Sequence, residues 1–238
     1  MMTKGGLSIL NELASMQWGL FTSAQAKRYG ISRQQLSRYS SKDQIERLAF
    51  GVYKVRGASI NPHQDIQVAW LSVDPDKLLT ERQNERETGI VVGGHTAAYL
   101  YGVGDLWATP YLFITHRRKQ SQRPEIIFRT RKLLPEDVTM IEGMPVTGPE
   151  YTLATLAAEG EDMAHISDAA FHLSRKVTLD QDKLSDLLAP HARAYGFSST
   201  DGQSFAQVLF THAAQVLAKE FIATYGTEAH KLLQKHES

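Results

Sequence analysis

The chain has 238 residues, of which 42% are hydrophobic, and its 26 Lys and Arg balance 26 Asp and Glu to a formal net charge of zero. This is the composition of a globular protein, and the lack of cysteine excludes disulfides, thiolate zinc sites and a cysteine nucleophile. No apolar run approaches the roughly 20 residues that cross a bilayer, and no signal-peptide pattern opens the chain, so we expect a cytoplasmic protein without a membrane segment.

Three helices are predicted at the N-terminus. Apolar residues recur at helical spacing from about Leu7 to Met16, which indicates a first helix. Two Ser/Thr-x-x-Gln sequences begin at Thr22 and Ser32, and each can form a capping box at a helix start. Gly30 lies between them, where the end of a helix favours a left-handed residue. Two short helices joined in this way are typical of a helix-turn-helix.

The second of these helices and the segment after it predict a winged helix. The helix has an apolar side with Leu36 and Tyr39, and its other sides are polar and basic. Two short apolar runs, Gln44 to Leu48 and Val52 to Val55, flank a tight turn and predict a hairpin that would be the wing.

Charge indicates that this region binds a DNA duplex. Residues 1–60 hold nine Lys and Arg against three Asp and Glu, a net charge of +6. Basic side chains neutralise phosphates and release counterions, whereas the alternative is a solvated charged surface that contacts proteins. The predicted DNA-binding residues of this region are Thr22, Ser32, Arg33, Gln34, Ser37, Arg38, Lys42, Arg47, Lys54 and Arg56.

We place a domain boundary in the small, polar stretch from Ala58 to Pro62, which separates a DNA-binding domain at 1–58 from a second domain at 59–238. The second domain should begin with a helix from His63 to Val73, a charged stretch over 80–88 and a strand at 90–92. Strands at 111–115 and 126–129 then flank a second basic segment, with a net charge of +6 over 117–132. We expect this segment to be an exposed hairpin loop. Its residues Arg117, Arg118 and Lys119 could extend the DNA contacts, bind an acidic partner or be merely solvated.

The remaining sequence predicts a hairpin at 138–141 and 144–147, followed only by helices. These begin at Gly148 and continue over about 164–176, 180–188, 204–225 and 228–236. The helix from Ser204 has the broadest apolar face and should be the core helix of the second domain. Residues 133–238 carry −8, which disfavours duplex binding. The predicted fold is α+β, with an N-terminal winged helix-turn-helix and a larger mixed domain that is helical at its C-terminal end.

Enzyme motifs are missing from the sequence. The nine histidines show no His-x-His or His-Glu-x-x-His spacing, and no Gly-x-Ser-x-Gly or kinase signature occurs. We also find no set of carboxylates of the nuclease type after a strand. The sequence therefore predicts no catalytic residue, no metal ligand and no cofactor.

Three segments resemble one protein family over roughly residues 7–160. LFTSAQAKRYGISRQQLSRY, followed by IERLAFGVYKV, resembles the winged-helix domain of AbiEi-type antitoxins. GGHTAAYLYGV is similar to the small-Ala-Ala-x-Leu-x-Gly segment of that family, and GMPVTGPEYTLATLA is similar to its Gly-hydrophobic-Pro-Val-Thr-x-x-Glu-x-Thr-Leu stretch. This chain has Tyr151 where family members commonly carry Arg.

The resemblance implies an antitoxin of a type IV toxin–antitoxin system, which provides phage defence by abortive infection. Such a protein represses its own operon at an operator with inverted repeats and counteracts a nucleotidyltransferase-like toxin. The residues themselves support the DNA-binding half of this expectation, and the toxin half rests on the resemblance. The alternative function is an antitoxin that binds its toxin directly, with little or no DNA binding.

Overall fold

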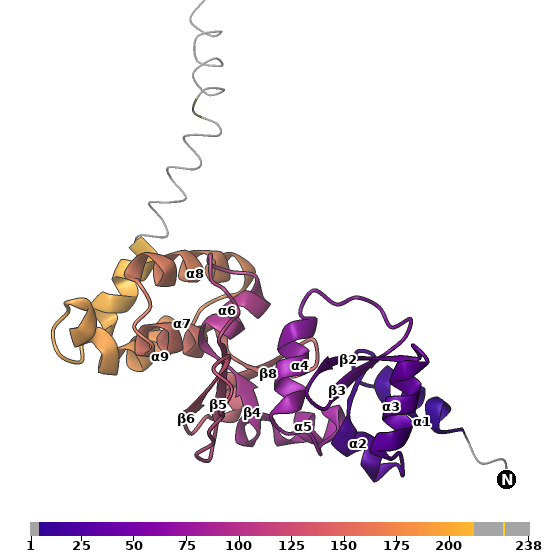
Figure 1. Ribbon diagram of the computed structural model, residues 1–238. Coiled ribbons are helices and arrows are strands. Elements are labelled where there is room, and N and C mark those ends of the chain that lie inside the picture. Colours follow the sequence, from indigo (N-terminus) through magenta and orange to yellow (C-terminus); the bar gives the residue numbers. More distant parts are fainter. Residues whose placement is uncertain (1–4, 212–225, 227–238) are drawn as a thin grey trace, which may run out of the picture. The chain divides into compact units, whose positions relative to one another are not determined.

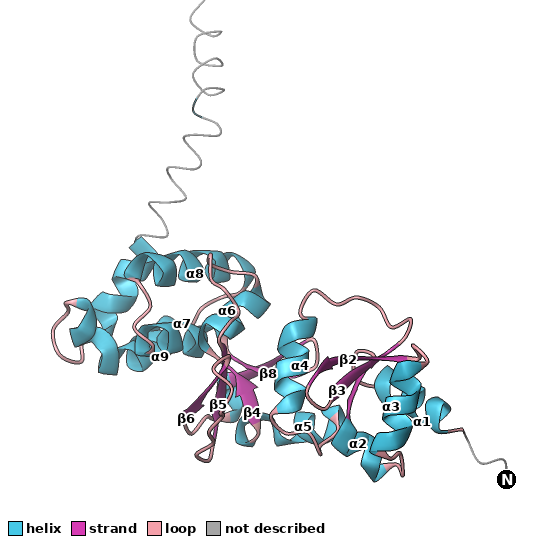
Figure 2. Cartoon of the chain, viewed as in Figure 1, coloured by secondary structure: helices cyan, strands magenta, loops and turns pink. Residues whose placement is uncertain are grey.

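The computed structural model describes residues 5–211 and residue 226, and its elements mix helices and strands as the predicted α+β class requires (Figures 1 and 2). The chain forms two compact units. Unit 1 comprises Met1–Val92 and Ala108–Val146, and unit 2 comprises Gly93–Trp107 and Thr147–Ser238. The predicted boundary between residues 58 and 59 lies inside unit 1, and the independence of the two parts on either side of it stays a prediction.

The first part of unit 1 is a winged helix. Its elements are α1 (Gly6–Ser15), β1 (Leu20–Thr22), α2 (Ser23–Arg28), α3 (Arg33–Ser41), β2 (Ile45–Ala49) and β3 (Val52–Val55). The strands form an antiparallel sheet in the order β1-β3-β2. Strand β1 was not predicted, because three residues are too few to show an alternating pattern.

Both predicted capping boxes are present. The Thr22 hydroxyl accepts a hydrogen bond from the Gln25 backbone N–H at 3.0 Å, and the Gln25 side chain accepts from the Thr22 N–H at 2.8 Å. Ser32 and Gln35 make the same pair of bonds at the start of α3, at 3.2 and 2.8 Å. Gly30 has a φ of +78°, the left-handed conformation expected between the two helices. These local signals therefore fix where α2 and α3 begin.

The rest of unit 1 is a five-stranded mixed sheet with two helices before it. Its elements are α4 (Gln64–Ser72), α5 (Leu79–Glu85), the 3-10 turn η1 (Arg86–Thr88), β4 (Ile90–Val92), β5 (Tyr111–Thr115), β6 (Ile126–Thr130), η2 (Pro135–Asp137), β7 (Val138–Ile141) and β8 (Met144–Thr147). The strand order is β6-β5-β4-β8-β7. The neighbouring strands β7 and β8 match the predicted hairpin.

The predicted hairpin loop between β5 and β6 is wrong. The two strands are parallel, with Tyr111 opposite Ile126 and Thr115 opposite Thr130. Parallel strands need a crossover connection, so residues 116–125 run from the end of β5 back to the level at which β5 begins. The periodicity of a sequence predicts the position of a strand but not its direction, so the parallel pairing of β5 with β6 could not be predicted from neighbouring residues.

Trp18 and Trp70 connect the winged helix with the sheet inside unit 1. The Trp18 indole N–H donates to the Glu142 carbonyl oxygen at 2.9 Å, and its ring meets that of Trp70 edge-on, with centroids 6.2 Å apart. The Trp70 indole N–H donates to the Ile90 carbonyl at 2.8 Å. Arg82 stacks on the Trp70 ring at 3.2 Å, and burial lowers the pKa of its guanidinium to about 9. The two parts of unit 1 thus share a continuous packed junction.

Unit 2 is helical within the described residues. It contains α6 (Gly94–Tyr101), α7 (Pro149–Ala158), α8 (Met163–Lys176), α9 (Gln181–Leu188), η3 (Ala189–Tyr195) and a helical stretch over 202–211. Its core includes Ala98, Leu153 and Phe205. The predicted helices near 164–176 and 180–188 are confirmed, and the helix from Ser204 is confirmed up to residue 211. Its continuation to Tyr225 and the helix predicted over 228–236 lie outside the described residues.

The two C-terminal segments that carried the family resemblance have structural roles in unit 2. Ala97 and Ala98 are fully buried, and Gly102 ends α6 with a φ of +62°. Glu150 is buried and accepts from the Asp180 backbone N–H at 2.9 Å, at the start of α9. Both segments therefore position helices. Among the described residues, no helix has the length and apolar character to span a bilayer.

Candidate DNA-binding surface

Helix α3 presents one polar, basic stripe to solvent. Leu36 is 1% exposed and belongs to the core of the winged helix, with Tyr39 packed against that core. The helical repeat places five other residues, at positions 33, 34, 37, 38 and 41, on the opposite side of α3. They are Arg33, Gln34, Ser37, Arg38 and Ser41, and all are exposed. Four of the predicted DNA-binding residues thus share one surface.

The wing tip lies beside the start of α2. Phe50 and Gly51 form the turn between β2 and β3, with Ala49 paired to Val52. The Gly51 carbonyl accepts from the Ser23 backbone N–H at 2.8 Å, which attaches the turn to the first residue of α2. Arg47 is exposed on β2, with its guanidinium carbon 5.5 Å from the centre of the Phe50 ring.

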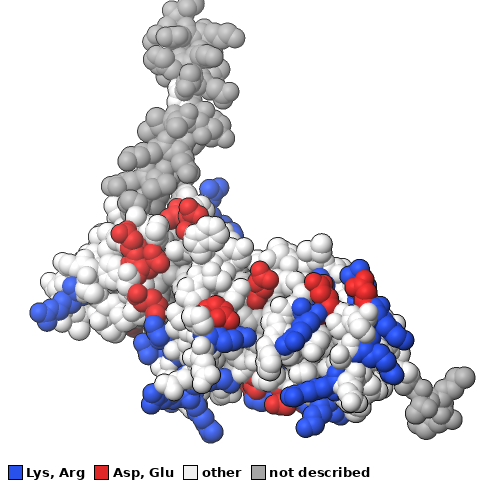
Figure 3. Space-filling view, viewed as in Figure 1, with Lys and Arg blue, Asp and Glu red and all other residues white. Residues whose placement is uncertain are grey.

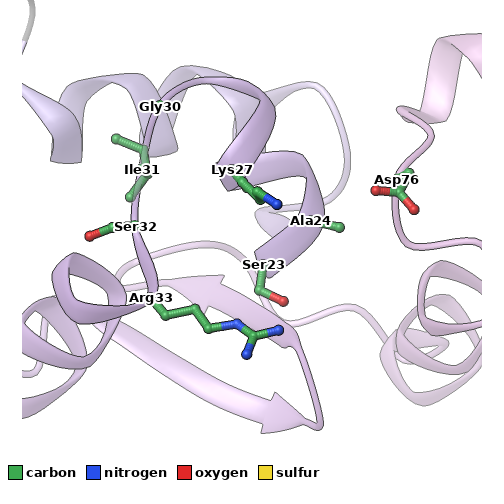
Figure 4. A pocket seen from close by; sticks show the side chains of 8 residues that line it. All are labelled: Ser23, Ala24, Lys27, Gly30, Ile31, Ser32, Arg33 and Asp76. Atoms are coloured by element: carbon green, nitrogen blue, oxygen red, sulfur yellow. The ribbon is translucent and has the colours of Figure 1, made fainter.

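An open hollow of about 560 Å³ lies between α2, the helix-turn-helix turn and the start of α3. Figure 4 shows Ser23 between Lys27 and Arg33, with Asp76 across the hollow. Lys27 and Ser23 were not predicted as site residues. Their spacing of four residues places both on one side of α2, which is the signal that could have identified them. Lys27 and Arg33 outnumber Asp76 and leave a net positive charge around the hollow, which suits it to an anion.

Thr22 and Lys54, both predicted to contact DNA, have other roles. Thr22 is fully buried, and its hydroxyl donates to the Pro75 carbonyl while it caps α2. Lys54 is 8% exposed, and its Nζ donates to the Gln64 side-chain oxygen at 2.6 Å. These predictions are corrected because neither side chain reaches the surface, which no local sequence pattern could reveal.

The other predicted residues of this region lie at two places. Ser32 is exposed at the start of α3, where its hydroxyl caps the helix, and it lines the hollow together with Arg33. Lys42 follows the last turn of α3 and is exposed. The Arg56 guanidinium pairs with Asp43 at 2.6 Å, and its backbone N–H donates to Gln44 at 3.1 Å. Lys42 and Arg56 thus lie at the base of the hairpin, away from the tip.

Helix α2 and the nearby Gln17 are fixed to the start of α5 and to the segment just before it. The Gln25 side chain donates to the Lys77 carbonyl at 2.7 Å, and the Leu79 N–H donates to the Gln17 side chain at 3.3 Å. Arg28 pairs with Glu81 at 2.7 Å. The hydrogen bond from Arg28 is the main cause that lowers the pKa of the Glu81 carboxyl to about 2. The charge of Arg28 is therefore already balanced, and we exclude it from the DNA-binding surface.

The parallel pairing of β5 and β6 gathers a second basic cluster at one end of the sheet. Arg117 and Arg118 are exposed just after β5, and Arg131 and Lys132 are exposed just after β6. The Arg131 N–H donates to the Thr115 carbonyl at 3.1 Å, so the two strand ends are adjacent. Arg131 and Lys132 were not among the predicted site residues.

Lys119 differs from Arg117 and Arg118. It is half-buried, with its amine 5.9 Å from the centre of the Phe128 ring, and burial lowers the pKa of the amine. Lys119 thus lies along β6 rather than among the exposed arginines.

The two units have opposite formal charges. Unit 1 holds 19 Lys and Arg against 13 Asp and Glu, a charge of +6, and unit 2 holds 7 against 13, a charge of −6. On the face of unit 1 seen in Figure 3, basic side chains gather over the winged helix. Across residues 5–211 and 226, no group of three His, Cys, Asp or Glu could hold a metal ion.

Comparisons with known proteins agree with this architecture. The RV2827C protein from Mycobacterium tuberculosis has a similar structure, with a TM-score of 0.50 and 15% identity over 86% of this chain and 80% of that chain. At this identity the likeness supports the fold alone. The comparison with curated proteins gave no match.

Two family models match the sequence. Residues 8–55 match a transcriptional regulator, AbiEi antitoxin, and residues 89–197 match the AbiEi antitoxin C-terminal domain. The first match contains nearly all of the winged helix, and the second contains the five-stranded sheet and the helices α6 to α9. Together they cover more than half of the chain, which therefore belongs to the AbiEi antitoxin family of transcriptional regulators.

Proposed function

We propose that the chain is a cytoplasmic, non-enzymatic DNA-binding autorepressor and antitoxin of a type IV toxin–antitoxin system. In this function it represses its own operon, counteracts a nucleotidyltransferase-like toxin and takes part in phage defence by abortive infection. The observation that carries the DNA-binding half is the exposed stripe of Arg33, Gln34, Ser37 and Arg38 on α3, next to a wing and on a unit of charge +6. Family membership supports the regulator and antitoxin roles.

Helix α3 would enter the major groove, as recognition helices of this motif do. Gln34 can pair bidentately with adenine, and Arg33 or Arg38 with guanine. Lys27, beside the hollow, and Lys42, at the end of α3, would contact phosphates. Phosphate contacts set the position of the helix on the duplex, and base contacts provide the specificity.

A footprint on the promoter of the chain's own operon tests this function. We expect the intact chain to protect inverted repeats that are one or more helical turns apart, and to lower expression from that promoter in a reporter strain. Specific binding should exceed binding to a random duplex by at least about a thousandfold at physiological salt. Equal affinity for both duplexes would contradict the proposal.

The acidic charge of unit 2 favours the second candidate function, a direct contact with the toxin. Unit 2 holds 13 Asp and Glu against 7 Lys and Arg, and this charge would complement a basic surface around the nucleotide site of a toxin. Direct contact would appear as a complex of the two purified proteins without DNA. Such a complex, together with a promoter that stays unbound, would favour the interaction-only antitoxin.

The second basic cluster is expected to extend the footprint of the winged helix. If Arg117 and Arg118 each contact a phosphate, replacing both with Ala should flatten the log–log dependence of affinity on salt by about 0.9 per contact. Lys119→Ala should change this slope less, because the amine is half-buried beside Phe128.

Binding measured on one operator duplex over a series of salt concentrations checks this expectation, with Lys119→Ala as the matched control. An unchanged slope in the double variant would remove the cluster from the DNA-binding surface and favour an acidic protein partner for it.

A further inference from the structure

We propose that Phe50, at the tip of the wing, determines specificity by inserting its ring into the minor groove beside each half-site and kinking the DNA there. This inference rests on the proposed DNA-binding function. It adds a residue that recognises the deformability of the duplex rather than the edges of its bases.

The exposure of Phe50 has no explanation within the fold. Its side chain is 84% exposed, the highest value for an aromatic residue in the described part of the chain. Tight turns favour Gly, Asn, Asp and Ser for backbone reasons, and a phenylalanine provides none of these advantages. A large apolar ring held in water at the tip of a hairpin is therefore suited to burial against a partner.

The turn that carries the ring is firmly supported. Strand β3 is the central strand of the three-stranded sheet, so both of its edges are paired. The hydrogen bond from Ser23 to the Gly51 carbonyl attaches the turn to α2, and Gly51 has a φ of +74°, which a glycine adopts without strain. The pairing register of β2 with β3 also shifts between Arg47 and Ala49. Such an irregularity changes the direction of side chains that would otherwise alternate between the two faces of the sheet.

The basic side chains around the Phe50 ring indicate that its partner is a polyanion. The Arg47 guanidinium lies over the ring at 5.5 Å, and its Nε donates to the Ala49 carbonyl at 3.3 Å. Lys27 and Arg33 line the neighbouring hollow next to Ser23, the residue bonded to the turn. A second copy of this face would bring like charges together. Minor grooves, by contrast, attract arginine and accept apolar wedges between base steps, which unstack and bend the duplex.

The test uses the intact chain and the duplex that it selects from a random pool, labelled with a dye at each end to report bending. We compare Phe50→Ala with Phe50→Leu, which keeps an apolar wedge. Ile60→Ala is the matched control, because Ile60 is 91% exposed in unit 1 and lines a hollow with Val55 and Arg56, at the end of β3 opposite to the wing tip.

We expect Phe50→Ala to remove the bend and to weaken operator binding roughly tenfold, as the loss of one buried ring implies. Phe50→Leu should keep most of the bend, and Ile60→Ala should match the unmodified chain. Replacing a flexible pyrimidine–purine step beside the half-site with a stiff A-tract should weaken the unmodified chain but not Phe50→Ala.

An unchanged bend in Phe50→Ala, or equal sensitivity of both proteins to the A-tract, would overturn the inference and leave the proposed function intact. A smaller oligomer of Phe50→Ala in the absence of DNA, together with an unchanged bend of the DNA in the complex, would also overturn the inference. The ring would then serve self-association. If the unmodified chain selects no duplex, both this inference and the proposed function are wrong.

Discussion

Replacing Arg33, Gln34 and Arg38 together with Ala should abolish operator recognition while the protein still folds. All three side chains are exposed on one side of α3, and Ala is the residue that best maintains a helix. Each bidentate contact with a base provides ~1–3 kcal/mol of discrimination, so the triple variant should lose specific affinity by a factor of at least about a hundred. Binding to random duplex should fall much less, because most phosphate contacts remain.

Fluorescence anisotropy on the operator and on a random duplex, at one salt concentration, measures both losses. Arg193→Ala is the control, because it removes an exposed arginine from unit 2. An equal loss on the two duplexes would show that the three side chains only contact the backbone. Arg38→Ala alone should already weaken operator binding more than random binding.

The start of each helix in the helix-turn-helix could be predicted because its signals are local. Thr22 with Gln25, and Ser32 with Gln35, are three residues apart, and each pair forms its capping box without help from distant chain. The glycine turn and the hairpin at Phe50 and Gly51 likewise depend on a few consecutive residues. The polar stripe of α3 follows from helical periodicity once the start of the helix is known.

The errors arose where distant segments decide the environment of a residue. Lys54 was predicted to be a cation of the wing that contacts DNA. In the structure its amine donates to the Gln64 side chain, and β1 pairs with β3, the strand that carries Lys54. Arg117 and Arg131 looked like parts of one hairpin, and parallel pairing instead places them side by side at the end of the sheet. Burial and strand direction are tertiary properties, so the spacing of residues in the sequence does not reveal them.

The same triple variant of α3 should still protect cells from the toxin. Unit 2 has its own core and a charge of −6, opposite to that of unit 1, so removing cations from α3 leaves unit 2 unchanged. Repression of the promoter reporter should disappear, and growth with the co-expressed toxin should remain at the level of the unmodified antitoxin. Substitutions test this better than cutting at residue 58, because a cut would separate Gln17 and Gln25 from Leu79 and Lys77.

The reciprocal variant is Gly202→Ala in unit 2. A Cβ at Gly202 would lie 1.9 Å from the Ser185 carbonyl oxygen, so the helical stretch over 202–211 must move away from α9. We expect protection to be lost while repression persists, because unit 1 keeps its own packing. Growth rescue and reporter output are measured for both variants, each expressed at an equal protein level.

If the triple variant failed to protect, counteraction would work through repression. If Gly202→Ala protected fully while its thermal unfolding showed a disrupted unit 2, neutralisation would have to be assigned to unit 1.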